Sequence, residues 1–201
     1  MPFPKTWLEE MVIEWLHLEG FLVEANLPVS TPERGGRREA DVVGGKISDD
    51  TLVIKHVETG TLAGGKGSIT SIEKKFSLTV AQPVTEYFKQ RLSFTSDRVD
   101  YQKMYVASYW TAPTVEGLKR LGVLVVTLPD FICGWVLPTI SRWKGKPPHR
   151  PRIGGKHITL PETYWLLQLV DYLNTRDLLT CPPRCDIGSP NVRSVESCDC
   201  A

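Results

Sequence analysis

The alternation of hydrophobic and polar positions predicts that the chain begins with a helix followed by a strand. Thr6 is suited to cap the helix, because its side-chain oxygen can accept a hydrogen bond from the first turn. Apolar residues then recur at helical spacing through residues 7–18, and Gly20 is suited to end the helix. Glu14 lies beside the apolar stripe, where it is either a solvated carboxylate or one directed at a functional site. Residues 21–29 follow as a predicted strand.

Residues 40–57 have the pattern of a β-hairpin, with two apolar, β-branched runs on either side of a polar turn. Side chains alternate between the two faces of a strand, so Asp41 on the first arm and both His56 and Glu58 on the second are expected on one face. Two carboxylates and an imidazole are therefore predicted to meet at one end of the hairpin. A carboxylate that ends an apolar strand loses hydration unless a cation or donor meets it, and a divalent metal is the simplest partner.

Helices and strands continue to alternate after the hairpin. A helix is expected to begin near Thr70, which forms a capping box with Glu73, and to kink or split at Pro83. The later predicted elements are a strand at 103–110, a helix at 113–121, a buried strand at 123–128, a short helix at 131–143 interrupted at Pro138, and an amphipathic helix at 161–179. The predicted class is α/β, in the order helix, three strands, helix, strand, helix, strand (αβββαβαβ), with a mixed central sheet flanked by helices.

The length and composition are those of a soluble globular protein. The 201 residues suit one domain with an appendage, and the net charge of +1 gives no whole-chain reason to expect a membrane or a nucleic acid. No apolar run could cross a membrane, and the N-terminus lacks the pattern of a signal peptide, so a cytoplasmic protein is expected. The expected division is an α/β domain at 1–143, a basic linker rich in proline and glycine at 144–160, and a C-terminal helix with a cysteine-rich tail at 161–201.

Local clusters of basic residues could still contact nucleic acid. The loop at 30–38 carries three arginines, and residues 131–161 include no acidic side chain. The candidates for contacts with phosphate groups are Arg34, Arg37, Arg38, Lys66, Lys74, Lys75, Lys144, Lys146, Arg150 and Arg152. A solvated loop, a polar helix face and a linker kept soluble by its charge remain the alternatives.

Residues 60–68, GTLAGGKGS, nearly match the phosphate-binding sequence GxxxxGK[ST], which lies between a strand and a helix. Gly67 stands where a hydroxyl side chain would bind magnesium, and the later strand at 123–128 does not end in the aspartate that nucleotide hydrolases carry. Nucleotide binding through Gly60 to Lys66 is therefore a minor alternative.

Four of the five cysteines, Cys181, Cys185, Cys198 and Cys200, lie in the tail. Their spacing differs from the common zinc knuckle, so zinc and disulfides are both open, and either would staple the tail. Disulfides in a cytoplasmic protein would indicate a thermophile. Cys133 lies in an apolar segment and is expected to be an inert core thiol.

The order of the elements and the hairpin motif together resemble the PD-(D/E)XK nuclease superfamily, which includes restriction enzymes and archaeal Holliday-junction resolvases. The resemblance covers about residues 6–128 and leaves the C-terminal third unaccounted for. Asp41, in EADVVG, stands at the family's aspartate, His56-Val57-Glu58 at its (D/E)-x-K motif, and Glu14 where the family often has a helix glutamate. Histidine thus replaces the first acid and glutamate replaces the lysine, while Lys55 belongs to the opposite face of the strand.

The resemblance implies a restriction-endonuclease-like core and metal-dependent hydrolysis of phosphodiester bonds, with DNA favoured over RNA and with Asp41, His56, Glu58 and Glu14 as catalytic candidates. Asp41, His56 and Glu58 would hold a divalent ion, and the imidazole would favour manganese over magnesium. The basic residues would bind nucleic acid, no membrane partner is expected, and a homodimer is open. A nuclease fold that has lost catalysis and binds nucleic acid or serves in an assembly is the main alternative.

Overall fold

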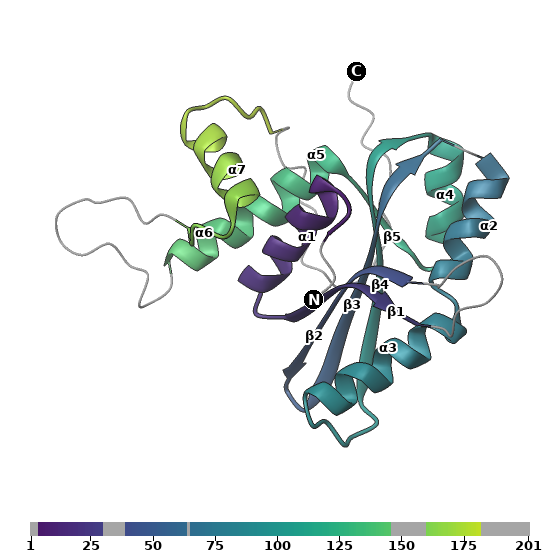
Figure 1. Cartoon of the computed structure of the whole chain (residues 1–201). Helices are drawn as coiled ribbons and strands as arrows, with labels where there is room; N and C mark the ends of the chain where they lie inside the picture. Colours follow the sequence, from purple (N-terminus) through teal and green to yellow (C-terminus); the bar gives the residue numbers. More distant parts are fainter. Residues whose placement is uncertain (1–3, 30–38, 64, 146–159, 182–201) are drawn as a thin grey trace.

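A five-stranded mixed sheet forms the centre of the protein, with helices against both of its faces (Figure 1). The computed structural model describes residues 4–29, 39–63, 65–145 and 160–181, without the side chains of residues 65–67. The strands are adjacent in chain order: β1 (Leu22–Pro28), β2 (Glu39–Ser48), β3 (Thr51–Leu62), β4 (Val99–Trp110) and β5 (Leu124–Thr127). The first three are antiparallel, whereas β3, β4 and β5 are parallel. The predicted α/β class, with a mixed sheet flanked by helices, is confirmed.

Side chains alternate along the strands, so each face of the sheet packs a different set of apolar residues against its own helices. On one face, Val42 packs with Trp15 in a core built from α1 (Trp7–Leu18), α5 (Leu128–Phe131), the π-helical turn η1 (Ile132–Val136), α6 (Leu137–Gly145) and α7 (Trp165–Thr175). On the other face, Val43 packs with Phe88 beneath α3 (Leu78–Arg91), and α2 (Gly65–Lys75) and α4 (Ala112–Arg120) lie beside it. The final helix α7 thus belongs to the same core as α1.

The predicted hairpin is formed by β2 and β3, which are longer than the sequence pattern suggested. The two residues of its turn, Asp49 and Asp50, have φ angles of 48° and 57°, as a tight turn that follows the twist of the strands requires. Gly45 permits the close approach of α3, because a Cβ atom at this position would lie 2.4 Å from the Phe88 ring. The hairpin therefore packs directly against α3, on the face that carries Asp41.

The helical segment after β3 differs from the prediction in its start and in its break. Helix α2 begins at Gly65 rather than near Thr70. The break falls at Phe76 and Ser77, where the Ser77 hydroxyl donates to the Lys74 carbonyl over 2.8 Å and Ser77 takes an extended conformation before α3. Pro83 lies inside α3 and does not split it, so the split predicted there was wrong. Helix α2 therefore ends before Pro83, at the point where the Phe76 side chain is buried and Ser77 is extended.

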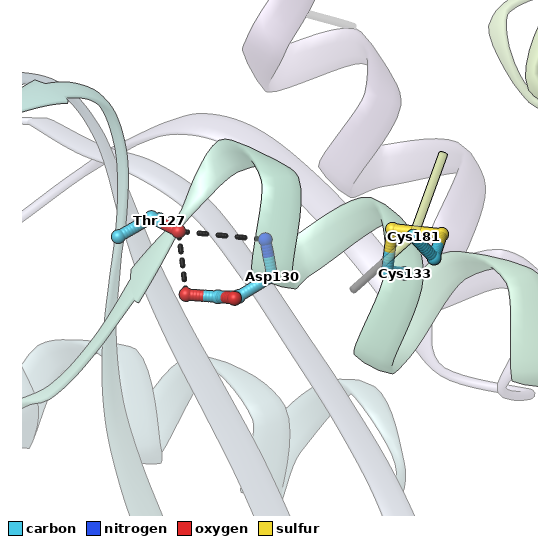
Figure 2. The surroundings of a disulfide bond; sticks show 4 residues. All are labelled: Thr127, Asp130, Cys133 and Cys181. Carbon is cyan, nitrogen blue, oxygen red and sulfur yellow. Dashed lines mark hydrogen bonds between the residues drawn. A yellow bond between two sulfur atoms is a disulfide. The ribbon is translucent and has the colours of Figure 1, made fainter. Parts of the chain in front are cut away.

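A disulfide joins Cys133, in η1, to Cys181, just beyond α7 (Figure 2). The Cα atoms of the two cysteines are 5.7 Å apart, which suits a disulfide. The prediction that Cys133 is an inert core thiol was wrong, because the chain that leaves α7 returns to η1. The interruption predicted at Pro138 is not observed, because Pro138 lies inside α6, and the π-helical turn η1 comes before it. Cys185, Cys198 and Cys200 lie outside the described residues.

Candidate functional site

Asp41 and Glu58 meet on the α3 face of the sheet, near the C-terminal end of β3. The backbone N–H of Asp41 donates to Glu58 Oε1 over 3.3 Å, and Asp41 Oδ2 accepts a hydrogen bond from the backbone N–H of Thr59 over 3.3 Å. Glu58 is fully buried, whereas the Asp41 side chain is 18% exposed. The prediction that the hairpin brings these two carboxylates together is confirmed.

Lys75 completes this carboxylate pair from the last turn of α2. Its Nζ atom is 3.2 Å from both Oδ1 and Oδ2 of Asp41 and also contacts Oε2 of Glu58. Phe76, the next residue, is buried, and its ring centroid is 4.7 Å from that of His56, so the end of α2 is fixed above the hairpin. The helix that follows β3 therefore brings an ammonium group to the two carboxylates.

His56 is fully buried and has a hydrogen-bonding partner at each ring nitrogen. Its Nε2 atom is 2.8 Å from Glu58 Oε1, and its Nδ1 atom is 2.8 Å from the hydroxyl of Tyr101 on β4. An ionised carboxylate only accepts hydrogen bonds, so Nε2 must carry the hydrogen that it donates to Glu58. His56 therefore orients Glu58 in this arrangement, and the prediction that it ligates a metal does not match its contacts.

Sequence reasoning missed Tyr101. It lies on the same face of the sheet as His56, two residues N-terminal to the position on β4 that pairs with it. Its neighbour on that face, Tyr105, lies opposite Glu58. The spacing of the two tyrosines, four residues apart on a predicted strand, was the available signal, but aromatic residues on a strand face most often indicate core packing.

The charges of the three central side chains are strongly coupled. Burial disfavours the charged form of Asp41 and the nearby Glu58 repels it, and together they raise the pKa of Asp41 to about 7. Burial acts on Glu58 in the same direction, but the hydrogen bond from His56 and the charge of Lys75 outweigh it and lower the pKa of Glu58 to about 2. Burial opposes the charge of Lys75 as well, yet the two carboxylates raise its pKa above the ordinary value.

The carboxylate pair suits a divalent cation better than the predicted three-ligand set does. Across the described part of the chain, no group of three or more His, Cys, Asp or Glu side chains is placed to hold a metal ion. Two carboxylates share one ammonium, and burial together with the charge of Glu58 raises the pKa of Asp41. Magnesium is usually held by one or two carboxylates, with waters and phosphate oxygens as its other ligands. Asp41 and Glu58 fit such an ion.

Glu14 does not lie with this pair. It is 1% exposed, and its carboxylate accepts hydrogen bonds from the backbone N–H groups of Leu166 over 3.3 Å and Leu167 over 2.8 Å, at the start of α7. These are N–H groups that a helix leaves without an internal partner, so Glu14 anchors the first turn of α7 to α1. Its contacts are structural, and the catalytic role predicted for it finds no support in them.

The predicted nucleic-acid contacts separate into three groups. Lys75 lies in the site, and Lys74 beside it is exposed. Lys144 pairs with Asp171 at 2.6 Å and so links α6 to α7. Arg34, Arg37, Arg38, Lys146, Arg150 and Arg152 lie outside the described residues, as does the side chain of Lys66.

The segment with the near match to a phosphate-binding loop is divided between two regular elements. β3 continues to Leu62 and α2 starts at Gly65, which leaves only residues 63 and 64 between them. A loop that surrounds phosphate groups with successive N–H groups needs more residues than this. The geometry gives the nucleotide-binding alternative no support.

The fold and the site define a mixed α/β protein with two carboxylates and a lysine at one end of its sheet. No known family and no curated protein matches the sequence. Among solved structures, the chain is similar to a protein of unknown function, AF1548, with 15% identity and a TM-score of 0.40, over 86% of this chain and 78% of that one. Within the described residues, no helix is long and apolar enough to cross a membrane.

Proposed function

We propose that the protein is a metal-dependent nuclease with a restriction-endonuclease-like core, and that it hydrolyses phosphodiester bonds in DNA. The observation that carries this proposal is the convergence of Asp41, Glu58 and Lys75 from two strands and a helix. Two carboxylates and one ammonium are the groups that a metal-dependent phosphodiester hydrolase needs at one point.

Lys75 favours an active nuclease over an inactive nucleic-acid-binding subunit. The inactive alternative rested on Glu58 in the place of the motif's lysine and on His56 in the place of its first acid. The ammonium of Lys75 stands in contact with both carboxylates, so the lysine's chemistry is supplied from another element. His56 donates to Glu58 and preserves a charged carboxylate there.

Each residue then has a defined task. Asp41 and Glu58 would hold a divalent ion, which supplies a Lewis acid at the scissile phosphate. Lys75 stabilises negative charge that develops on the phosphate oxygens. His56, held by Tyr101, fixes the orientation of Glu58 through hydrogen bonds of 2.8 Å. Thr59 fixes Asp41 through its backbone N–H.

The expected metal is magnesium rather than manganese. The preference for manganese depended on an imidazole ligand, and both nitrogens of His56 have other partners. A site whose protein ligands are carboxylate oxygens alone suits a hard ion. Manganese, which accepts the same geometry, should still support cleavage.

Cleavage assays with each metal test the proposal on plasmid DNA, single strands and four-way junctions. Asp41→Asn removes a charged ligand and keeps the shape, so cleavage should fall below detection. Lys75→Gln should reduce the rate constant by about 100-fold or more, as expected when one charge-stabilising group is lost. Lys119→Gln is the matched control, since Lys119 is exposed in the last turn of α4 and should have no effect. Binding without cleavage under any divalent ion would favour the inactive subunit instead.

A further inference from the structure

Two exposed aromatic residues stand at the end of β4, beyond the site. β5 pairs with β4 only from Met104 to Ala107, and the strand changes there from buried to exposed residues. Tyr109 is 58% exposed and Trp110 is 40% exposed. They pair with Thr61 and Leu62 of β3, the strand that carries Glu58. The tip of β4 therefore presents two rings beside the carboxylates.

The backbone that carries these rings is fixed on both sides. The Ser108 hydroxyl donates to the Gly60 carbonyl over 3.2 Å. The backbone N–H and the hydroxyl of Thr111 both donate to the Leu62 carbonyl, over 3.2 and 3.3 Å, and α4 starts at the next residue. The rings thus stand on an ordered strand end, and a ligand that contacts them would not have to order the backbone first.

The register gives the distance and the face of each ring relative to the site. Trp110 pairs with Leu62, beyond a shift in register that follows Gly60, and Leu62 lies four residues after Glu58. At the usual rise of a strand this is about 13 Å along the sheet. Leu62 packs with Tyr105, the β4 partner of Glu58, and so lies on the face of the carboxylates. Tyr109 pairs with Thr61 and belongs to the opposite face. The two rings therefore flank the strand tip, and Trp110 is the one on the side of the carboxylates.

We propose that Trp110, assisted by Tyr109, stacks on unpaired nucleobases next to the scissile phosphate, so that the substrate is a nucleic acid with a single-stranded segment. This inference rests on the proposed nuclease function and names its substrate class. A phosphate held at Lys75, which contacts Glu58, and a ring whose strand position lies about 13 Å along the sheet from Glu58 are together suited to a strand with exposed base planes. In an intact duplex the neighbouring base pairs cover those planes, and extruding a base costs a few kcal/mol.

The test measures binding and cleavage separately. Binding is measured with the Asp41→Asn protein in the presence of magnesium. The readout is the fluorescence anisotropy of a labelled single strand and of the duplex with the same sequence. Trp110→Ala should weaken single-strand binding by about 5-fold to 100-fold, the range for loss of one stacked base. Duplex affinity should change little, which also shows that the variant is folded. Trp110→Phe, which keeps a ring, should retain most of the affinity, and Tyr109→Ala should have the smaller effect.

Trp165→Ala and Tyr172→Ala are matched controls, because each of these residues is 54% exposed on α7, on the other side of the sheet from Lys75. If Trp110→Ala and the controls bind the single strand with equal affinity, the stacking inference is overturned. The nuclease proposal still stands in that case if the wild-type protein cleaves nucleic acid. Loss of single-strand binding in Trp110→Ala without cleavage by the wild-type protein would support stacking and overturn the catalytic proposal. A wild-type protein that binds neither nucleic acid would overturn both.

Discussion

Replacement of Lys75 by methionine should destabilise the protein by an amount that grows with pH. The substitution keeps the length and apolar stem of the side chain and removes only the ammonium that Asp41 and Glu58 share. Removing one partner from a fully buried ion pair costs about 3–5 kcal/mol, because the other charge is left uncompensated. Lys75 is 38% exposed, so water screens part of this effect. We expect a loss of about 2 kcal/mol near neutral pH, or about 4–8 °C in Tm.

The sign of the pH dependence follows from Asp41. Its pKa in the folded protein, about 7, lies above the ordinary value of 3.8, so the folded state binds this proton more tightly than the unfolded state does. The stability that it contributes is complete below pH 3.8 and is lost as the pH rises to about 7. Lys75 lowers the pKa of Asp41, so in the variant this loss should continue to higher pH. Below about pH 7 both proteins lose this contribution alike, so the difference from the wild-type protein should widen as the pH rises above about 7.

Urea denaturation followed by tryptophan fluorescence measures this difference at each pH. Lys119→Met is the control, since it removes a lysine from the last turn of a helix at an exposed position. A divalent ion at a hundred times its Kd for the variant should stabilise Lys75→Met by about 2.7 kcal/mol, and should stabilise the wild-type protein less at the same concentration. A loss that is the same at every pH, or that the control reproduces, would refute the charge coupling.

The remaining predictions concern the scaffold. Cys133→Ser, which removes the Cys133–Cys181 disulfide, should lower the free energy of unfolding measured by urea denaturation by up to about 4 kcal/mol, as a cross-link across 48 positions implies. Glu14→Gln should cost about 1–2 kcal/mol in denaturation experiments, because it weakens the anchor of α7, and should leave cleavage unchanged. Gly45→Ala should cost about 1–3 kcal/mol by overpacking, and more than Gly44→Ala, whose added Cβ would meet its nearest atom at 3.1 Å rather than 2.4 Å.

The parts of the fold that sequence pattern predicts are those in which local signals agree. Thr6 accepts a hydrogen bond from the N–H of Glu9 over 3.1 Å, so the cap and the apolar stripe of α1 are where they were predicted. The hairpin likewise combines strand periodicity with turn formers. The split between α2 and α3 was misplaced because Pro83 is the stronger local signal, whereas the break lies at Phe76 and Ser77, where the Phe76 ring packs against His56 of a distant strand.

The carboxylate pair of the site was predicted from strand periodicity, Lys75 was predicted only as one of several basic residues that could contact phosphate, and Tyr101 was missed. Asp41 and Glu58 share a face because two adjacent strands alternate in a fixed way. Lys75 reaches them only because α2 ends above the hairpin, and no spacing within the β3 motif contains that information. The same holds for Tyr101, which comes from a parallel strand 45 positions after His56.

Glu14, Glu58 and Asp41, three of the buried or half-buried acids, differ in how their charges are balanced. Glu14 accepts two backbone N–H groups and Glu58 accepts His56 and Lys75, and each carboxylate has a partner for both oxygens. Asp41 also has partners for both oxygens, the ammonium of Lys75 and the N–H of Thr59, but it shares that ammonium with Glu58, whose charge repels it. Folding alone would favour an apolar residue at such a position, since an under-compensated buried charge costs stability. A carboxylate that is costly to fold and partly open to solvent is most readily explained by a cation that it must bind, which is why Asp41 is the residue on which the proposed activity depends.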